Sequence, residues 1–180
     1  MSVIRKKIEF DLSESSIDEA IKEIDNFKKK LIEKTNTLKV KIANLIREKA
    51  NLGFKGAVSD DVIHPDNTLY ANVDVQVQED GDILVVIANG DDAVWVEFGA
   101  GVYHNGSVGS SPNPLGNDLG FKIGGYGKQG YKTTWAFRND ATKERYVTHG
   151  TPASMPMYKA LMECMNDFKA LVREVFDSND

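Results

Sequence analysis

The segment SIDEAIKEIDNFKKKLIEKTNTLKVKIANLIREKANL, residues 16–52, decides the fold because its apolar residues recur at steps of three and four. This spacing places them on one stripe of an amphipathic helix. Ser16 and Glu19 have the spacing of a capping box, and Gly53 can end the helix. Such a helix would be roughly 50 Å long, which is more than a domain of 180 residues usually spans. We therefore expect part of it to project or to pack against another subunit.

A second amphipathic helix is expected at residues 155–177. Pro156 suits the first turn of a helix, and an apolar stripe follows it. The stripe includes Cys164, the only cysteine, which excludes an intramolecular disulfide and fits a reducing compartment. The predicted stripe consists of Met157, Leu161, Cys164, Met165, Phe168, Leu171, Val172, Val175 and Phe176.

Strands are expected between the two helices. Residues 73–78 alternate between valine and polar residues, a turn follows at 79–82, and residues 83–88 are continuously apolar, so the sequence predicts a hairpin. The next apolar segment, residues 93–98, fits a third strand or a short helical turn equally well.

The predicted fold class is α+β, with the long N-terminal helix and the C-terminal helix packed on one side of a mostly antiparallel β-sheet. The sheet would contain the hairpin, the Trp95 segment and the strands around Trp135 and Tyr146. We expect a single domain. Its parts are an N-terminal strand or arm (1–14), the long helix (15–53), a loop (53–72), the hairpin and the segment after it (70–101), a Gly-rich loop (102–132), two strands (133–150) and the last helix (155–177).

The charge balance argues against a nucleic-acid-binding protein. There are 22 basic and 27 acidic residues, and the net charge of −5 gives no basic footprint for phosphate. No apolar run approaches the roughly 20 residues that span a bilayer, and the N-terminus carries charge where a signal peptide would be apolar. We expect synthesis in a cytoplasm and no membrane contact. The three histidines and the cysteine share no metal-ligand spacing, so neither a metal nor a cofactor is expected.

Two features invite a search for chemistry. Gly124, Gly125, Tyr126 and Gly127 suggest an anion-binding loop, but the spacing of a phosphate-binding loop is absent. We interpret the surrounding residues 102–132 as an interaction loop. Glu97 is the one acid in an apolar run and could be buried with a raised pKa, serving a structural hydrogen bond or a subunit contact.

Two short runs resemble signatures of one protein family. Residues 95–101, WVEFGAG, are similar to the V-E-F-G-T-G signature of the gene-product-ten-like family of phage tail-component proteins, with Ala100 where threonine is usual. Residues 149–157, HGTPASMPM, resemble the family's G-x-P-A-x-P-F/M stretch. The resemblance implies structural or interface roles for Trp95, Glu97, Phe98, Gly99, Gly101, Gly150, Pro152, Ala153 and Pro156.

The resemblance also implies a function. Members are structural proteins of viral assembly that form the neck, or tail-completion, ring connecting the head of a bacteriophage to its tail. The implied role is therefore a non-enzymatic, homo-oligomeric virion subunit, made in the bacterial host cytoplasm. Its partners would be copies of itself and other neck, tail-tube or tape-measure proteins, with DNA only as passing cargo. Two alternatives remain: a small hydrolase or nuclease using Glu97 and His149, and a generic protein-binding adaptor domain.

Overall fold

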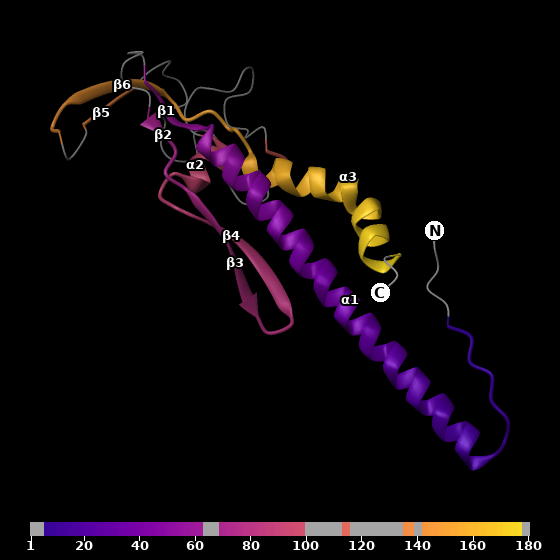
Figure 1. Cartoon of the computed structure of the whole chain (residues 1–180). Coiled ribbons are helices and arrows are strands. Elements are labelled where there is room, and N and C mark those ends of the chain that lie inside the picture. The colour runs from indigo at the N-terminus through magenta and orange to yellow at the C-terminus, as the bar shows by residue number, and fades with distance from the viewer. Residues whose placement is uncertain (1–5, 63–68, 100–112, 116–134, 139–141, 178–180) are drawn as a thin grey trace.

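The structure is a computed structural model that describes residues 6–62, 69–99, 113–115, 135–138 and 142–177. One long helix runs the length of the molecule, and the other elements gather around one of its ends (Figure 1). The described helices are α1 (Glu14–Lys55), α2 (Ala93–Phe98) and α3 (Pro156–Phe176).

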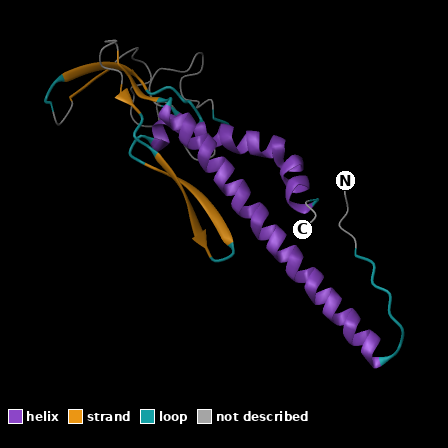
Figure 2. Ribbon diagram, in the orientation of Figure 1, coloured by secondary structure: helices purple, strands orange, loops and turns teal. Residues whose placement is uncertain are grey.

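The described strands form two sheets, and every strand pair is antiparallel (Figure 2). One sheet has the order β2-β1-β6-β5, and the other is the hairpin β3-β4. The predicted α+β class is confirmed, although the single expected sheet is divided in two. The strands are β1 (Val58–Val62), β2 (Leu69–Tyr70), β3 (Asp74–Asp80), β4 (Ile83–Asn89), β5 (Trp135–Arg138) and β6 (Arg145–Gly150).

α3 packs antiparallel along the C-terminal half of α1. An ion pair joins Lys49 to Glu163 at 2.6 Å. A second ion pair joins Lys41, which is nearer the N-terminus of α1, to Glu174, which is nearer the C-terminus of α3. At the end of α3, the Lys34 ammonium donates to the Phe176 carbonyl at 3.3 Å. Residues 14–33 of α1 therefore extend beyond the end of α3, as Figure 1 shows.

The hairpin β3-β4 packs along α1 as well. The Asn51 side chain donates its Nδ2 to the Val75 carbonyl at 3.1 Å and accepts the Val75 amide at 2.9 Å. Near the hairpin turn, the Lys39 ammonium donates to the Asp82 carbonyl at 3.0 Å. An asparagine on a helix thus completes the hydrogen bonding of a strand residue that is only 2% exposed.

The core lies where the C-terminal end of α1 meets the hairpin, α2 and the start of α3. Phe54 and Val96 are fully buried at its centre. Alanines contribute much of the rest, and their small side chains let the elements approach closely. The buried cluster consists of Ala50, Phe54, Ala57, Val75, Val96 and Ala160.

The predicted capping box of Ser16 and Glu19 does not form at the N-terminal end of α1. The helix begins at Glu14, and its N-cap residue is Ser13. Ser16 instead accepts a hydrogen bond from the Asp11 amide at 3.0 Å, while the Asp11 carboxylate accepts the Ser13 amide at 2.7 Å. Residues 6–13 form an arm without strand pairing, so no strand lies in the described part of the segment where a strand or an arm was expected. The arm returns along α1, and Lys6 lies 3.3 Å from Glu23.

Two further predictions need correction. The loop expected at residues 53–72 contains β1 and β2, and β1 pairs with the distant strand β6. The Trp95 segment is the helix α2, so it does not add a strand to the sheet. Most of the loop predicted at 102–132 lies outside the described residues.

Gly53 does not end α1, which continues to Lys55. A Cβ atom at Gly53 would lie 2.9 Å from the Pro156 Cβ, so glycine permits the close approach of α1 and α3. Gly53→Ala should therefore destabilise the protein by about 1–2 kcal/mol although alanine favours helix. Gly56→Ala is the matched control, because its Cβ would meet nothing closer than 3.8 Å.

Urea denaturation of the two variants tests this packing. We expect Gly56→Ala to leave the free energy of unfolding unchanged or slightly higher, since Gly56 has an ordinary φ of −92°. An equal, stabilising effect of both substitutions would show that the contact between Gly53 and Pro156 does not limit the helix packing.

Candidate functional site

The two runs that resemble family signatures meet in the structure. The Glu97 Oε2 accepts the Met157 amide at 2.8 Å, and its Oε1 accepts the Tyr158 amide at 3.0 Å. The Asn113 Nδ2 donates to the same Oε1 at 2.8 Å. We call these four residues the Glu97 junction. It joins the C-terminal end of α2 to the N-terminal end of α3 across about 60 residues of sequence.

The start of α3 explains why an acceptor is needed there. The N-cap residue Met155 has a left-handed backbone, with φ 54° and ψ 50°, and its side chain makes no capping bond. Pro156 has no amide hydrogen, so the next two amides are those that a cap would satisfy. Glu97 supplies this cap from another helix, and its carboxylate also suits the positive end of the α3 dipole.

Backbone bonds strengthen the same contact. The Val96 carbonyl accepts the amides of Ser154 at 2.8 Å and Met155 at 3.3 Å. After α2, Gly99 turns the chain with φ 80°, which is a conformation that favours glycine. The backbone of α2 therefore holds the residues just before α3, and a side chain of α2 holds the first turn of α3.

Glu97 is 7% exposed, and burial raises the pKa of its carboxyl above the ordinary value. The amides of Met157 and Tyr158, the Asn113 side chain and the charge of Lys159 oppose this rise without cancelling it. The prediction of a buried Glu97 with a raised pKa is confirmed.

This raised pKa predicts a pH dependence of stability. In the unfolded chain the Glu97 carboxyl has a pKa of about 4.3. The folded protein keeps this proton at a pH where the unfolded chain has already lost it. Unfolding then releases a proton, so stability falls as pH rises from about 4.3 through the folded pKa. Urea denaturation over a pH series that begins near about 4.3 should show a more negative slope of stability against pH in the native protein than in Glu97→Gln. Identical slopes would contradict it.

An apolar pocket of about 410 Å³ adjoins the Glu97 junction. Its titratable lining residues are Glu97 and Tyr158, and both Glu97 oxygens already accept hydrogen bonds. This lining suits an apolar side chain better than acid–base chemistry. Apolar members of the lining include Ile46, Phe54, Val86, Phe98, Leu115 and Leu161.

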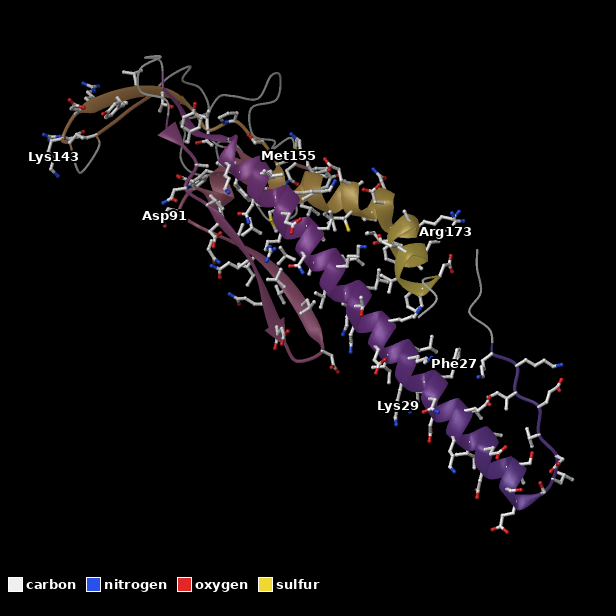
Figure 3. The ribbon with its side chains drawn as sticks, viewed as in Figure 1. Phe27, Lys29, Asp91, Lys143, Met155 and Arg173 are labelled. Carbon is white, nitrogen blue, oxygen red and sulfur yellow. The ribbon has the colours of Figure 1, made fainter. Side chains whose placement is uncertain are left out.

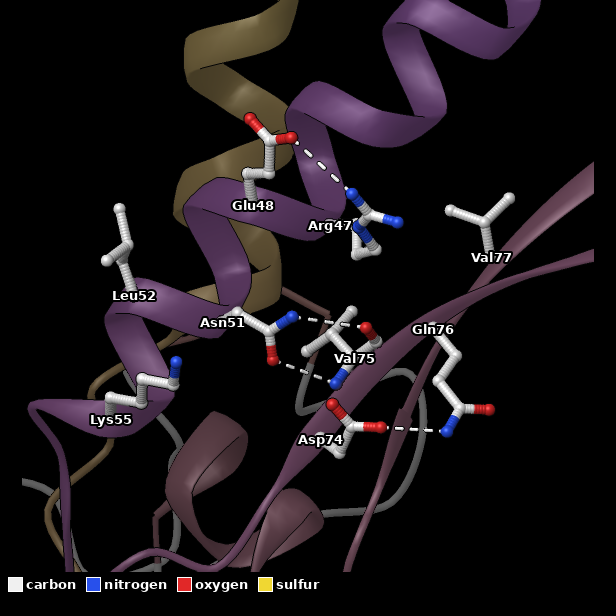
Figure 4. Close-up of a pocket in the computed structure, with 9 residues that line it drawn as sticks. All are labelled: Arg47, Glu48, Asn51, Leu52, Lys55, Asp74, Val75, Gln76 and Val77. Carbon is white, nitrogen blue, oxygen red and sulfur yellow. Dashed lines mark hydrogen bonds and ion pairs between the residues drawn. The ribbon is translucent and has the colours of Figure 1, made fainter.

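A second, more polar hollow of about 720 Å³ lies between α1 and β3 (Figure 4). Its polar side chains bond mainly to protein groups. Arg47 lies 3.4 Å from Glu48, and the Gln76 amide donates to Asp74 at 2.7 Å. The Asn51 side chain, also in this hollow, bonds the Val75 backbone. Neither histidine nor cysteine lines it, and its Asn51 holds β3 against α1.

The other predicted site residues have varied positions. Trp95 is 36% exposed on α2, Gly150 is buried with φ 114°, and Pro156 is buried against Gly53. Pro152 and Ala153 are half-buried before α3. Gly101, Gly124, Gly125, Tyr126, Gly127 and the side chain of His149 lie outside the described residues, so the proposed pairing of Glu97 with His149 has no geometry.

Sequence reasoning missed Asn113. It is 1% exposed, donates to Glu97, and accepts the Leu115 amide at 3.0 Å. Nothing in the surrounding Gly-, Ser- and Pro-rich sequence distinguishes it from an ordinary turn asparagine.

No family model, curated protein or solved structure matches the chain. Among the described residues, no three His, Cys, Asp or Glu side chains are grouped to hold a metal ion. The helices in the described ranges also lack a segment apolar and long enough to cross a membrane.

Proposed function

We propose that the chain is a non-enzymatic structural subunit of the neck, or tail-completion, ring that joins a bacteriophage head to its tail. The Glu97 junction carries this proposal. It brings together the two runs that resemble the signatures of phage tail-component proteins, and it uses the signature glutamate to cap a helix. A carboxylate engaged in this way favours a structural role for Glu97 over a catalytic one.

The shape of the subunit supports the same proposal. Residues 14–33 of α1 extend beyond α3, and a chain in a ring needs surfaces that reach its neighbours (Figure 1). The net charge of −5 suits a channel through which DNA passes without being held by cationic contacts. Other neck, tail-tube or tape-measure proteins would bind the faces of such a ring.

Deletion of the gene from its phage, with complementation, tests the proposal. Without the chain, heads and tails should accumulate separately. The fraction of joined particles is counted in electron micrographs of lysates. Wild-type protein should restore joining, as should Glu79→Ala, a control at an exposed hairpin residue. Joined, infectious particles that lack the protein would overturn the proposal. A Glu97-dependent turnover of nucleic acid or peptidoglycan by purified protein would instead favour the hydrolase or nuclease alternative.

A further inference from the structure

The two threonines of α1 lie near the middle of the helix and bond within it. The Thr35 Oγ1 donates to the Leu31 carbonyl at 2.7 Å, and the Thr37 Oγ1 donates to the Glu33 carbonyl at 3.0 Å. In an α-helix each of these carbonyls also accepts the amide four residues later. A carbonyl that is shared with a hydroxyl holds its helical amide less firmly, and such sharing often bends a helix.

Residues 35–37, Thr-Asn-Thr, are also weak helix formers. Threonine and asparagine disfavour a helix interior relative to alanine, because their side chains lose rotamer freedom or compete for backbone groups. All three side chains are exposed, so no packing compensates for this preference. Weak propensity and shared hydrogen bonds therefore coincide at residues 35–37.

The contacts of α1 with α3 and with the hairpin end at the same place. α3 ends at Phe176, whose carbonyl accepts the Lys34 ammonium. The hairpin packs on another side of α1 and turns near Asp82, whose carbonyl accepts the Lys39 ammonium. Figure 3 shows Phe27 in the part of α1 that projects beyond the end of α3. Residues 35–37 therefore lie where α1 leaves both of its neighbours.

The projecting part of α1 carries the described arm with it. Lys6 of the arm lies 3.3 Å from Glu23, and the Asp11 amide donates to the Ser16 hydroxyl at 3.0 Å. A hollow of about 650 Å³ between the arm and α1 is lined by Lys6 and by α1 residues between positions 23 and 33. All of these contacts lie on the N-terminal side of Thr35, so the arm and the projecting helix form one unit.

We propose that Thr35, Asn36 and Thr37 form a hinge about which residues 6–33 swing as one body. The helix stays continuous, and the amide bonds to the shared carbonyls lengthen as it bends. Glu14 lies about 30 Å from the hinge along the helix, so a bend of roughly 30° moves the tip by about 15 Å. This device goes beyond the proposed function, because it is a property of the single chain. In a ring, the hinge lets the tip meet a neighbour at more than one angle.

The distance from the tip of α1 to the hairpin tests the hinge. In a Cys164→Ser background, spin labels at Glu19→Cys and Asp80→Cys report this distance by double electron–electron resonance. Both sites are exposed, and Asp80 lies at the end of β3 beside the hairpin turn. We expect a broad distribution of distances in this protein. Adding Thr35→Ala and Thr37→Ala should reduce its width roughly twofold, because both hydroxyls are removed and alanine favours the helix.

Two controls locate the bend. Asp25→Ala with Asn26→Ala makes a similar change of helix propensity inside the projecting part and should leave the width unchanged. Labels at Asp80→Cys and Lys169→Cys, both in the packed part of the molecule, give the width of a rigid pair. A native width no greater than that of the rigid pair would overturn the proposal. So would equal narrowing by the two pairs of alanine substitutions, since the bending is then spread along α1.

Amide hydrogen exchange gives a second measurement. Thr35→Ala with Thr37→Ala should raise the protection of the amides of residues 35–37 roughly tenfold. Asn36→Gly should lower this protection and broaden the distance distribution, because glycine weakens a helix interior. All three positions are exposed, so these variants should keep the fold. Unchanged protection in both variants would show that residues 35–37 do not control the opening of the helix, and the hinge would be wrong.

Discussion

Glu97→Ala is expected to lower the free energy of unfolding by on the order of 4 kcal/mol. The substitution leaves the amides of Met157 and Tyr158 and the side chain of Asn113 without their shared acceptor. Each buried donor left unsatisfied costs about 1–3 kcal/mol, and removal of the desolvated carboxyl offsets part of the sum. Urea denaturation followed by circular dichroism measures the loss.

Two further variants serve as comparisons for Glu97→Ala. Glu97→Gln keeps one acceptor oxygen but places an amide group near a backbone donor, so its effect should be intermediate. Glu163→Ala removes an exposed partner of Lys49, and solvent screens this ion pair, so the loss of stability should be much smaller. If Glu97→Ala were no more harmful than Glu163→Ala, the junction would not hold α2 and α3 together.

Gly90→Ala should destabilise the protein by roughly 3 kcal/mol or more. Gly90 has φ +146°, and a Cβ atom there would lie 2.2 Å from the Asn72 carbonyl oxygen. That backbone cannot easily retreat, because the Asn72 amide donates to the Asp92 carboxylate at 3.2 Å. The turn between β4 and α2 would therefore have to rebuild.

Gly81→Ala is the matched control at the hairpin turn. Gly81 also has a positive φ of +60°, but nothing lies within 4 Å of its Cβ position. Only backbone strain of about 1 kcal/mol is expected there. Thermal unfolding of both variants separates the cost of backbone strain, which both share, from the cost of the steric clash with Asn72, which only Gly90→Ala has. Equal losses of stability at the two positions would contradict the close approach of Gly90 to Asn72.

Local periodicity was enough to predict the two long helices, α1 and α3, and the hairpin. The steps of three and four residues in α1, and the alternation around Val75, depend on neighbouring residues alone. β1 and β2 were missed because their pairing is distant. Asp61 of β1 pairs with Gly150 of β6, and no property of the short sequence VSDDV indicates that partner.

The candidate site was predictable only in part. A lone acid in an apolar run indicates a buried carboxylate, and Glu97 is buried. Its bonds were not predictable, because Asn113 and Met157 are 16 and 60 residues away. Sequence also could not separate the covered part of an apolar stripe from the open part. Cys164 and Met165 were predicted on one face, yet Cys164 is 3% exposed and Met165 is 62% exposed.

Electron cryomicroscopy of the neck in purified virions tests the central proposal most directly. The account predicts a closed ring of copies of this chain at the head–tail junction. Absence of the chain from the particle, or its presence only at another position in the virion, would contradict the account.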